Sequence, residues 1–467
     1  MLTFHDSNPA GSVMGRRDFL RAGGLALGGL TLGDLLTVQA AAKAKNLAVR
    51  DKSVIFLFMH GGPSQFETFD PKMDAPSNIR SATGEVKTSI PGITFGATFP
   101  KLARLADKFS IVRSFVTGDG NHDIKPVVSR DTLKANMGSL YARVAGPVNP
   151  ATTMPTNIAL FPRAVNPGSG EAVRNFGDLA SAGEVGAAYA PMVPGAGGGL
   201  QEDLKLHLPQ ERLTDRRGLL SSLDEFRRRI DHSGQIETMG AIQQQAFDTL
   251  LGGVSGAFDL SGEDPRVVAR YDTAPLLSRD RISKKWNNHK NYGDHAESLG
   301  KLLLMARRLC ERGCGFVTVT TSFVWDMHAD TNNATLVEGM GYVGTPFDHA
   351  VAAFIEDIEA RGLSEKILLV CCGEMGRAPT INKDGGRDHW GNLAPLMLYG
   401  GGLKMGQVIG QSTRNGGEPA SDIVTPRDLM ATVMHTLLDI GEVRLMDGIP
   451  RNVLDAVTGG QPIKGLT

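Results

Sequence analysis

One segment near the start of the chain constrains the fold more than any other. Residues 53–59 read Ser-Val-Ile-Phe-Leu-Phe-Met, a continuous apolar run that ends at His60-Gly61-Gly62. A strand with one face in water alternates polar and apolar residues, whereas a short continuous run is typical of a strand buried on both faces. Such strands belong to parallel sheets that are covered by helices.

The same kind of apolar run recurs along the chain, at residues 109–115, 316–321, 367–372 and 396–399. Helical patterns lie between strands at residues 99–108 and 347–361, and the second ends at Arg361-Gly362 as a helix should. Strands that alternate with helices predict an α/β fold, a three-layer α/β/α sandwich with a mostly parallel sheet.

Two regions depart from this alternation. Residues 200 to about 310 are charged and helical in period, which predicts a helical insertion or cap on the sheet domain. Its helices are expected at residues 219–230, 236–251 and 295–312. Residues 144–198 are rich in Pro, Gly and Ala, and long irregular loops are expected there. The whole of residues 41–467 is otherwise expected to form one domain.

The first 40 residues have the layout of a targeting peptide. Arg16-Arg17 is followed by Phe19-Leu20, then by an uncharged run at residues 22–33 and small residues at 38–40. The order and the paired arginines predict a twin-arginine signal, with the Tat machinery as partner and a periplasmic or other extracytoplasmic location. An amphipathic N-terminal helix is the alternative. No later segment approaches the ~18 apolar residues of a membrane span, so none is expected in the mature form.

The net charge and the cysteines limit which partners and which cysteine chemistry are expected. A net charge of −1 leaves no basic footprint for nucleic acid, so no nucleic-acid partner is expected. Cys371 and Cys372 are adjacent in an apolar run, where their side chains would face opposite sides of a sheet. Cys310 and Cys314 also lack the spacing of a zinc site. Buried free thiols are therefore expected, although an exported protein could also form disulfides.

Side chains that bind metals cluster just after the predicted strands. In doubly wound α/β sheets, ligands bind beyond the carboxyl ends of the strands. The residues at these positions are His60, Thr117 to Asp123 with His122 among them, Asp326, His328, Glu374, Arg377 and, soon after, Arg387, Asp388 and His389. Imidazole and carboxylate together are the ligand set of zinc, manganese or iron, and oxygen-rich sets suit magnesium or calcium.

Each of these residues also has an ordinary structural interpretation. A histidine after a strand is often a turn residue, Asp388-His389 could be an Asx turn, and Glu374 could pair with Arg377. Asp326 and His328 alternate with Met327, so both would face the same way in extended backbone. Because accidental positions would scatter along the chain, their convergence at one sheet edge favours a metal site.

The motifs together resemble a known family. They are His60-Gly61-Gly62-Pro63-Ser64, Trp325-Asp326-Met327-His328, Gly373-Glu374-Met375-Gly376-Arg377, Gly386-Arg387-Asp388-His389-Trp390 and Thr425-Pro426, preceded by the twin arginines. In this order they resemble the bacterial family called domain of unknown function 1501. That family is similar to the alkaline phosphatase and sulfatase superfamily, whose α/β/α sandwich supports metal-dependent ester hydrolysis at its sheet edge.

The resemblance implies a metal site with departures from the superfamily. Asp326 and His328 resemble its ligands of a first metal, with His389 as the later histidine. Glu374 stands where the superfamily has Asp, and Met375 where it has His. Met is a poor ligand for a hard metal. His60 stands where a metal-binding Asp is usual.

The resemblance also implies catalytic roles. The nucleophile position falls at His122 or its neighbours, where the superfamily has Ser, Thr or a modified Cys, and Thr117 is the only hydroxyl in that loop. His122 could then act as base or acid. Arg377 or Arg387 could hold a sulfate or phosphate oxygen pair.

Three functions are therefore compatible with the sequence. The first is an exported metal-dependent hydrolase of phosphate or sulfate esters, acting on small molecules or polysaccharide, with zinc or else manganese, iron or calcium. The second is a non-catalytic binding or cell-surface protein that has lost the nucleophile. The third is another metal-dependent transferase or isomerase, since a fold does not fix a reaction.

Overall fold

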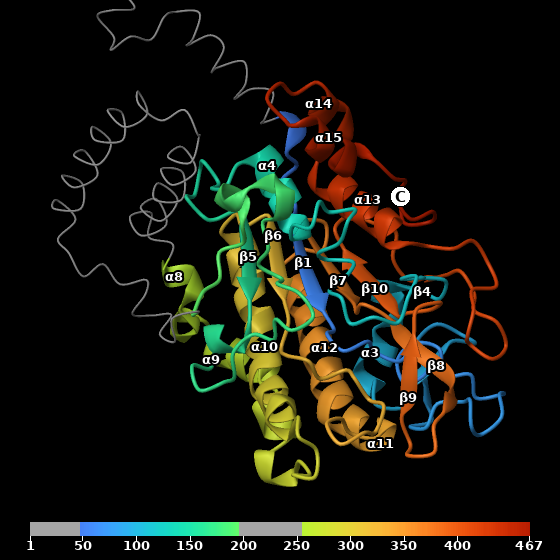
Figure 1. The fold of residues 1–467 in the computed structure, drawn as a ribbon. Coiled ribbons are helices and arrows are strands. Elements are labelled where there is room, and N and C mark those ends of the chain that lie inside the picture. The colour runs from blue at the N-terminus through green and yellow to red at the C-terminus, as the bar shows by residue number, and fades with distance from the viewer. Residues whose placement is uncertain (1–46, 196–254) are drawn as a thin grey trace, which may run out of the picture.

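A seven-stranded sheet forms the centre of the molecule in the computed structural model, which describes residues 47–195 and 255–467 (Figure 1). The strand order is β11-β4-β10-β7-β1-β6-β5. The strands are β1 (Ser53–Phe58), β4 (Phe109–Val112), β5 (Asn157–Leu160), β6 (Phe316–Val319), β7 (Ile367–Cys372), β10 (Leu396–Gly400) and β11 (Val408–Ile409). Only β10 runs against the others, so the predicted mostly parallel sheet is confirmed.

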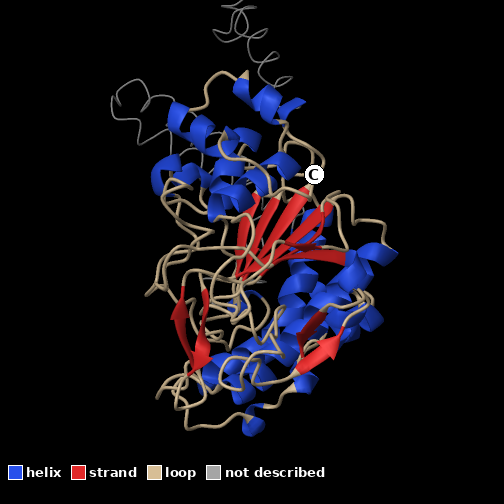
Figure 2. Cartoon of the chain, turned by 90° about the vertical axis from the view of Figure 1, so that its right-hand side faces the viewer, coloured by secondary structure: helices blue, strands red, loops and turns tan. Residues whose placement is uncertain are grey.

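Helices cover both faces of this sheet, as Figure 2 shows. One layer contains α3 (Pro100–Arg104), α10 (His289–Glu311) and α12 (Thr345–Ala360). The other contains α4 (Met137–Ala145), α13 (Pro426–Leu437), α14 (Ile440–Arg444) and α15 (Arg451–Thr458). The fold is thus a three-layer α/β/α sandwich.

The apolar runs of the sequence are explained by these two layers. Ile55 and Leu57 of β1 belong to the core under α10 and α12, whereas Val54 and Phe56 belong to the core under α4 and α13. A strand that alternates between two cores needs apolar residues at every position. Cys371 and Cys372 likewise face opposite cores, and all four cysteines are free and buried.

Shorter elements complete the described chain. They are the hairpin of β2 (Glu85–Lys87) and β3 (Thr94–Gly96), the hairpin of β8 (Gly376–Ile381) and β9 (Arg387–Trp390), and the helices α8 (Ser255–Phe258), α9 (Pro265–Tyr271) and α11 (Leu336–Gly339). None of the helices described is long and apolar enough to cross a membrane.

Two expectations about regions need correction. Residues 144–198 are not only loops, because β5 adds an edge strand beside β6. The four residues of β5 are too few to stand out among the surrounding prolines and glycines. The end of the predicted insertion is also a layer of the sandwich, since α10 packs on β6, β1 and α12. The helices predicted at 219–230 and 236–251, and the signal at 1–40, lie outside the described residues.

Candidate metal centre

The loops that follow the parallel strands lie at one edge of the sheet. β1, β4, β6 and β7 run in the same direction, so the loops that follow them leave from the same edge. The loop after β1 passes very close to the loop after β6. A Cβ on Gly61 would lie 2.5 Å from the backbone nitrogen of Asp326, and Gly61 has a φ of +116°. Only glycine permits this approach, which sets the position of Asp326.

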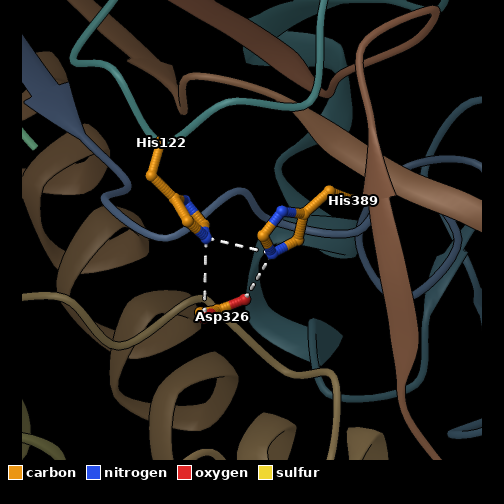
Figure 3. Close-up of side chains that lie close together, drawn as sticks. All are labelled: His122, Asp326 and His389. Atoms are coloured by element: carbon orange, nitrogen blue, oxygen red, sulfur yellow. Dashed lines mark hydrogen bonds and ion pairs between the residues drawn. The ribbon is translucent and has the colours of Figure 1, made fainter.

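Three side chains from distant parts of the chain meet at this edge (Figure 3). The Nε2 atoms of His122 and His389 are 3.0 Å apart. Nε2 of His122 lies 3.6 Å from Oδ2 of Asp326, and Nε2 of His389 lies 3.4 Å from Oδ1. Within the described residues, these are the only three His, Cys, Asp or Glu side chains whose ligand atoms converge in this way. We call His122, Asp326 and His389 the metal-ligand triad.

The loop of His122 is fixed to the strand that carries His389. The backbone amides of Thr117 and Gly118 both donate to the carbonyl of Gly391, each at 3.0 Å. The backbone is packed so tightly here that a Cβ on Gly391 would lie 2.4 Å from backbone atoms of Asp119. This contact explains how two histidines 267 positions apart reach one point.

A buried lysine closes the same loop. Nζ of Lys125 donates to carboxylate oxygens of Asp119 at 2.8 Å and of Asp123 at 2.7 Å. The Lys125 side chain is 9% exposed, whereas both aspartates are more than half exposed. Lys125 therefore ties together the two residues that flank the His122 turn, and we call this contact the lysine clip.

Glu374 orients His122 rather than joining the triad. The imidazole Nδ1 of His122 lies 2.9 Å from Oε1 of Glu374, which also accepts from the backbone amide of Gly61 at 2.9 Å. A proton on Nδ1 that is shared with this carboxylate leaves the Nε2 lone pair of neutral His122 facing the triad. Glu374, a predicted metal ligand, is thus placed like the carboxylate that fixes the orientation of a histidine in known metal sites.

Asp326 also accepts hydrogen bonds from a guanidinium and from an amide. Nη2 of Arg377 donates to Oδ1 at 2.6 Å, and Nδ2 of Asn333 donates to Oδ2 at 3.0 Å. Nε2 of His328 lies 3.1 Å from Oδ2, as expected from its alternation with Asp326. His328 therefore lies beside the triad and could serve as a fourth ligand or as a proton donor.

The charges at this edge of the sheet shift the pKa values of Asp326, His122 and His328. Burial disfavours the charged Asp326, but Arg377 and the three histidines outweigh it and lower the pKa of Asp326 well below its usual range. Burial likewise opposes charging of His122, yet Asp326 and Glu374 raise the pKa of His122 above 6.5. The hydrogen bond to Asp326 raises the pKa of His328. Both of these histidines are thus stabilised as cations by the same anion, which indicates a place that favours positive charge.

The geometry of the triad fits a divalent metal. Ligand atoms of a tetrahedral zinc ion, at about 2.0–2.1 Å from the metal, lie roughly 3.3 Å from one another. The two imidazole nitrogens are 3.0 Å apart, and they lie 3.4 and 3.6 Å from different oxygens of Asp326, which is close to this value. Two imidazoles and a carboxylate suit zinc, manganese or iron. The same set does not suit calcium, which takes oxygen ligands.

The two arginines do not form an anion clamp, contrary to the prediction. Arg377 is fully buried, and beyond Asp326 its guanidinium donates to the carbonyls of Gly61, Gly62 and Arg387. Arg387 is fully buried against Glu67 and the face of Phe66. Because the N–H groups of both arginines donate to groups of the protein, the arginines stabilise the loops instead of binding substrate.

Three more predicted residues lie outside the triad. The hydroxyl of Thr117 is 3.4 Å from the carbonyl of Gly391, so Thr117 is a loop residue and not a nucleophile at this centre. The predicted loop at Asp388 is the strand β9, in which Asp388 and His389 face opposite ways. Asp388 is therefore exposed, and its carboxylate accepts a hydrogen bond from the side-chain amide of Asn382. His60 is buried among aromatic rings and is not one of the described residues whose ligand atoms converge at the triad.

Sequence reasoning also missed residues that shape the centre. Asn333 braces Asp326 and is itself held by the side-chain amide of Asn288, at 2.7 Å. Phe176 and Phe323 pack against the ring of His122, with centroids 5.1 and 4.7 Å away. No local signal marks these residues, since Phe176 lies in a loop and Asn333 in a polar stretch.

Met375, which stands in place of a superfamily histidine, takes no part in the centre. Its side chain is fully buried and lies against Gly62.

The chain belongs to the family described as Protein of unknown function (DUF1501), which matches residues 51–451. This match confirms the resemblance seen in the motifs. The sequence matches no curated protein.

Among solved structures, the chain is similar to a sulfatase from Pseudoalteromonas sp., with 13% identity over 92% of this chain and 75% of that chain and a TM-score of 0.32. A phosphonate monoester hydrolase from Silicibacter pomeroyi shows 9% identity, with coverage of 88% and 78% and a TM-score of 0.33. A mutant of TAB5 alkaline phosphatase with bound Mg shows 11% identity, with coverage of 79% and 96% and a TM-score of 0.25. Scores this low carry no argument about activity.

Proposed function

We propose that this member of the DUF1501 family is a metal-dependent hydrolase of phosphate or sulfate esters. The observation that carries the proposal is the metal-ligand triad, in which donor atoms from two loops and from β9 lie within 4.8 Å of one another. Their place at the carboxyl edge of the sheet, where α/β proteins bind ligands, supports the same function. The proposed metal is zinc, with manganese or iron as the alternatives.

Each residue at and beside the metal-ligand triad has a separate role in the proposal. His122, Asp326 and His389 would hold the ion, and Glu374 would keep Nε2 of His122 free for it. When bound, a divalent ion supplies a Lewis acid that polarises the ester group. His328 is 26% exposed on its side chain and carries a raised pKa, so it is suited to hold a proton near neutral pH and give it to the departing alcohol.

The hydroxyl of Thr117 faces Gly391, so the proposal does not use a covalent intermediate on this residue. Water attacks the phosphorus or sulfur directly, the ester oxygen leaves, and the alcohol takes the proton of His328. The proton that the attacking water releases passes to solvent, from which His328 is protonated again. The balance is one water consumed for each ester cleaved.

A second candidate rests on the burial of Arg377 and Arg387. Enzymes that transfer phosphate or sulfate need positive groups around the transferred anion, and neither arginine is available for this. A metal-containing binding protein without catalysis is therefore the competing function.

The two functions can be separated with purified protein. Metal content per chain is measured by plasma mass spectrometry after purification without chelators, followed by a screen of phosphate and sulfate monoesters. Near-stoichiometric metal and hydrolysis that both fall in His389→Ala, but not in His435→Ala, are the expected results. Metal without hydrolysis would favour the binding protein, and absence of metal after reconstitution would contradict both.

We also propose that the protein acts after export by the twin-arginine pathway. The proposal rests on Arg16-Arg17 and the apolar run that follows them. Replacement of both arginines by lysine should retain the protein in the cytoplasm, as measured by cell fractionation. Unchanged export of this variant would contradict the proposal.

A further inference from the structure

Two phenylalanines form one side of the metal-ligand triad. The rings of Phe176 and Phe323 are stacked, with centroids 4.7 Å apart and planes 28° apart. Both rings touch His122, whose ring lies tilted to Phe176 and edge-on to Phe323. We call Phe176 and Phe323 the aromatic wall.

The aromatic wall extends inward to a buried polar atom. The ring of His60 meets Phe323 and Phe176 edge-on, at centroid distances of 5.0 and 5.8 Å. Nε2 of His60 is buried and has no hydrogen-bond partner among the described residues. Burial lowers the pKa of His60, so the imidazole is neutral at physiological pH. The ring of His60 thus continues the aromatic surface of the wall, with one uncharged nitrogen, while the buried charges of Glu374 and Arg377 contact other atoms of the triad.

The two members of the wall differ in exposure. Phe323 follows β6 and is 8% exposed, whereas Phe176 follows β5 and is only partly buried. Phe176 is therefore the more accessible member of the wall.

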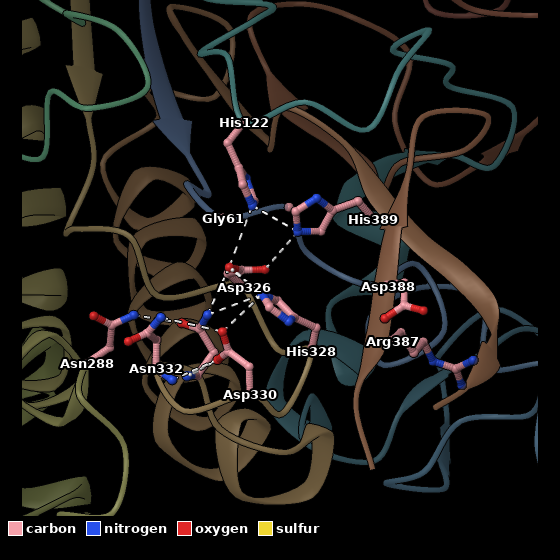
Figure 4. A network of polar contacts seen from close by, with 12 residues as sticks. Gly61, His122, Asn288, Asp326, His328, Asp330, Asn332, Arg387, Asp388 and His389 are labelled. Carbon is pink, nitrogen blue, oxygen red and sulfur yellow. Dashed lines mark hydrogen bonds and ion pairs between the residues drawn. The ribbon is translucent and has the colours of Figure 1, made fainter. Parts of the chain in front are cut away.

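Polar side chains lie close to Asp326 of the triad. They are His328, Asp330 and Asn332, and the backbone amide of Asn332 donates to the carboxylate of Asp330 (Figure 4). A molecule held at the triad would thus meet the aromatic rings beside His122 and imidazole, amide and carboxylate groups beside Asp326. This combination suits a compound with a flat apolar face and polar edges.

We propose that the aromatic wall binds the organic group of the ester and selects a ring with an apolar face, pyranose or aryl, over an acyclic group. The inference rests on the proposed function, because it takes the triad as the place where the anionic end of the ester binds. Stacking on Phe176 should strengthen binding of a ring compound about 2- to 10-fold.

The test uses the zinc-reconstituted protein and compounds that need no turnover. Dissociation constants are measured by calorimetry for phenylphosphonate, with an aryl ring, and for ethylphosphonate, without one. The phosphonate analogues of glucose 6-phosphate and glycerol phosphate, which lack the ester bond, make the corresponding pyranose pair. The variants are Phe176→Ala and Phe176→Tyr, with Leu445→Ala as the control. Leu445 is 77% exposed beside α14, which lies near the start of β1 at the opposite end of the strands (Figure 1).

At least one ring compound should bind more tightly than its acyclic partner, and the pair that discriminates identifies the ring as aryl or pyranose. Phe176→Ala should remove that preference while leaving the acyclic affinity within about 2-fold, and Phe176→Tyr should keep it. Melting temperatures of all variants verify that the fold is intact. Equal affinity for ring and acyclic compounds, or no binding of either, would overturn the inference.

Failure of the proposed function gives a different result. If ring compounds bind with the predicted preference but no ester is hydrolysed, the aromatic wall is upheld and the hydrolase function is contradicted. If esters are hydrolysed without any preference for rings, the hydrolase function is upheld and the wall is a structural shield for His122.

Discussion

The buried histidine of α10 and the histidines at the sheet edge differ in the partners of their ring nitrogens. His295 of α10 is fully enclosed, and each ring nitrogen has its own partner, the hydroxyl of Thr321 at 2.7 Å and the carbonyl of Val343 at 3.1 Å. Burial lowers the pKa of His295 to about 4, against the weaker opposing effect of the Val343 hydrogen bond. This histidine is neutral and satisfied, so it needs no ligand.

The histidines at the sheet edge share one partner instead. Nε2 atoms of His122, His328 and His389 all face the carboxylate of Asp326, within 3.6 Å. Three neutral rings cannot all donate to two oxygens that Arg377 and Asn333 already approach. The contrast teaches that a buried histidine is a candidate ligand when its nitrogens converge on others, and a structural residue when each is separately satisfied.

The largest test of this contrast removes a ring from the triad. His389→Ala should lower zinc affinity at least about 100-fold, since losing a ligand costs more than losing a residue that only orients one. The metal-free melting temperature should change little, because the side chain of His389 is 34% exposed. Zinc titration against a chelating indicator measures the effect, with His435→Ala as control. Equal affinities in the two variants would remove His389 from the site.

A second test moves the His122 loop without touching a ligand. In Gly391→Ala, the new Cβ would lie 2.4 Å from the backbone of Asp119, so the loop has to shift. We expect zinc affinity to fall about 10- to 100-fold. Gly341→Ala is the control, because a Cβ there meets nothing within 4 Å. Unchanged affinity in Gly391→Ala would show that the packing does not position His122.

The reverse test removes the satisfied histidine. His295→Gln should lower the free energy of unfolding by about 2–3 kcal/mol, because a buried hydroxyl or carbonyl loses its partner. Zinc affinity should stay within about 2-fold. Urea unfolding of the metal-free protein at pH 7 and zinc titration give the two values. A loss of zinc binding with intact stability would reverse the assignments of His295 and the histidines at the sheet edge.

The same variant carries a pH signature. The folded pKa of His295, about 4, lies below its unfolded value of 6.5. Its stabilising contribution is therefore complete above pH 6.5 and is lost as the pH falls from 6.5 towards 4, because the unfolded chain binds the proton first. Between about pH 7 and pH 5, the wild type should lose about 2 kcal/mol more than His295→Gln. Parallel stability curves for the two proteins would contradict this.

The smallest expected effect concerns the lysine clip. Lys125→Met retains the buried stem but removes the ammonium that joins Asp119 and Asp123. Since both aspartates are exposed, the change should cost only a few-fold in zinc affinity. Lys301→Met, on α10, is the control. A null effect on zinc binding would mean that the Gly391 contact alone holds the loop.

Much of the architecture could be predicted from local sequence. The runs at β1 and β7 mark strands buried on both sides, and the rule for strand ends placed Asp326, His122 and His389 at one edge. The signal is strong because it depends on neighbours in the sequence. β9 and β5 were missed since each is short and depends on a partner strand for its conformation.

The roles of the predicted site residues were harder to assign. In the sequence, Arg377 and Arg387 look free to bind an anion. In the structure, their N–H groups donate to backbone carbonyls of other loops. The sequence predicts Glu374 as a metal ligand and His122 as a catalytic residue, and it does not show that Glu374 orients His122, because the contact between them joins residues 252 positions apart. Residue type and strand-end position identify a site, whereas the use of each side chain depends on tertiary packing.

An anomalous scattering map from crystals of the zinc-reconstituted protein, collected at the zinc edge, tests the metal site most directly. One strong peak should lie about 2.0–2.2 Å from Nε2 of His122, Nε2 of His389 and a carboxylate oxygen of Asp326. A fully occupied peak at other residues, with none at these three, would contradict the proposed site.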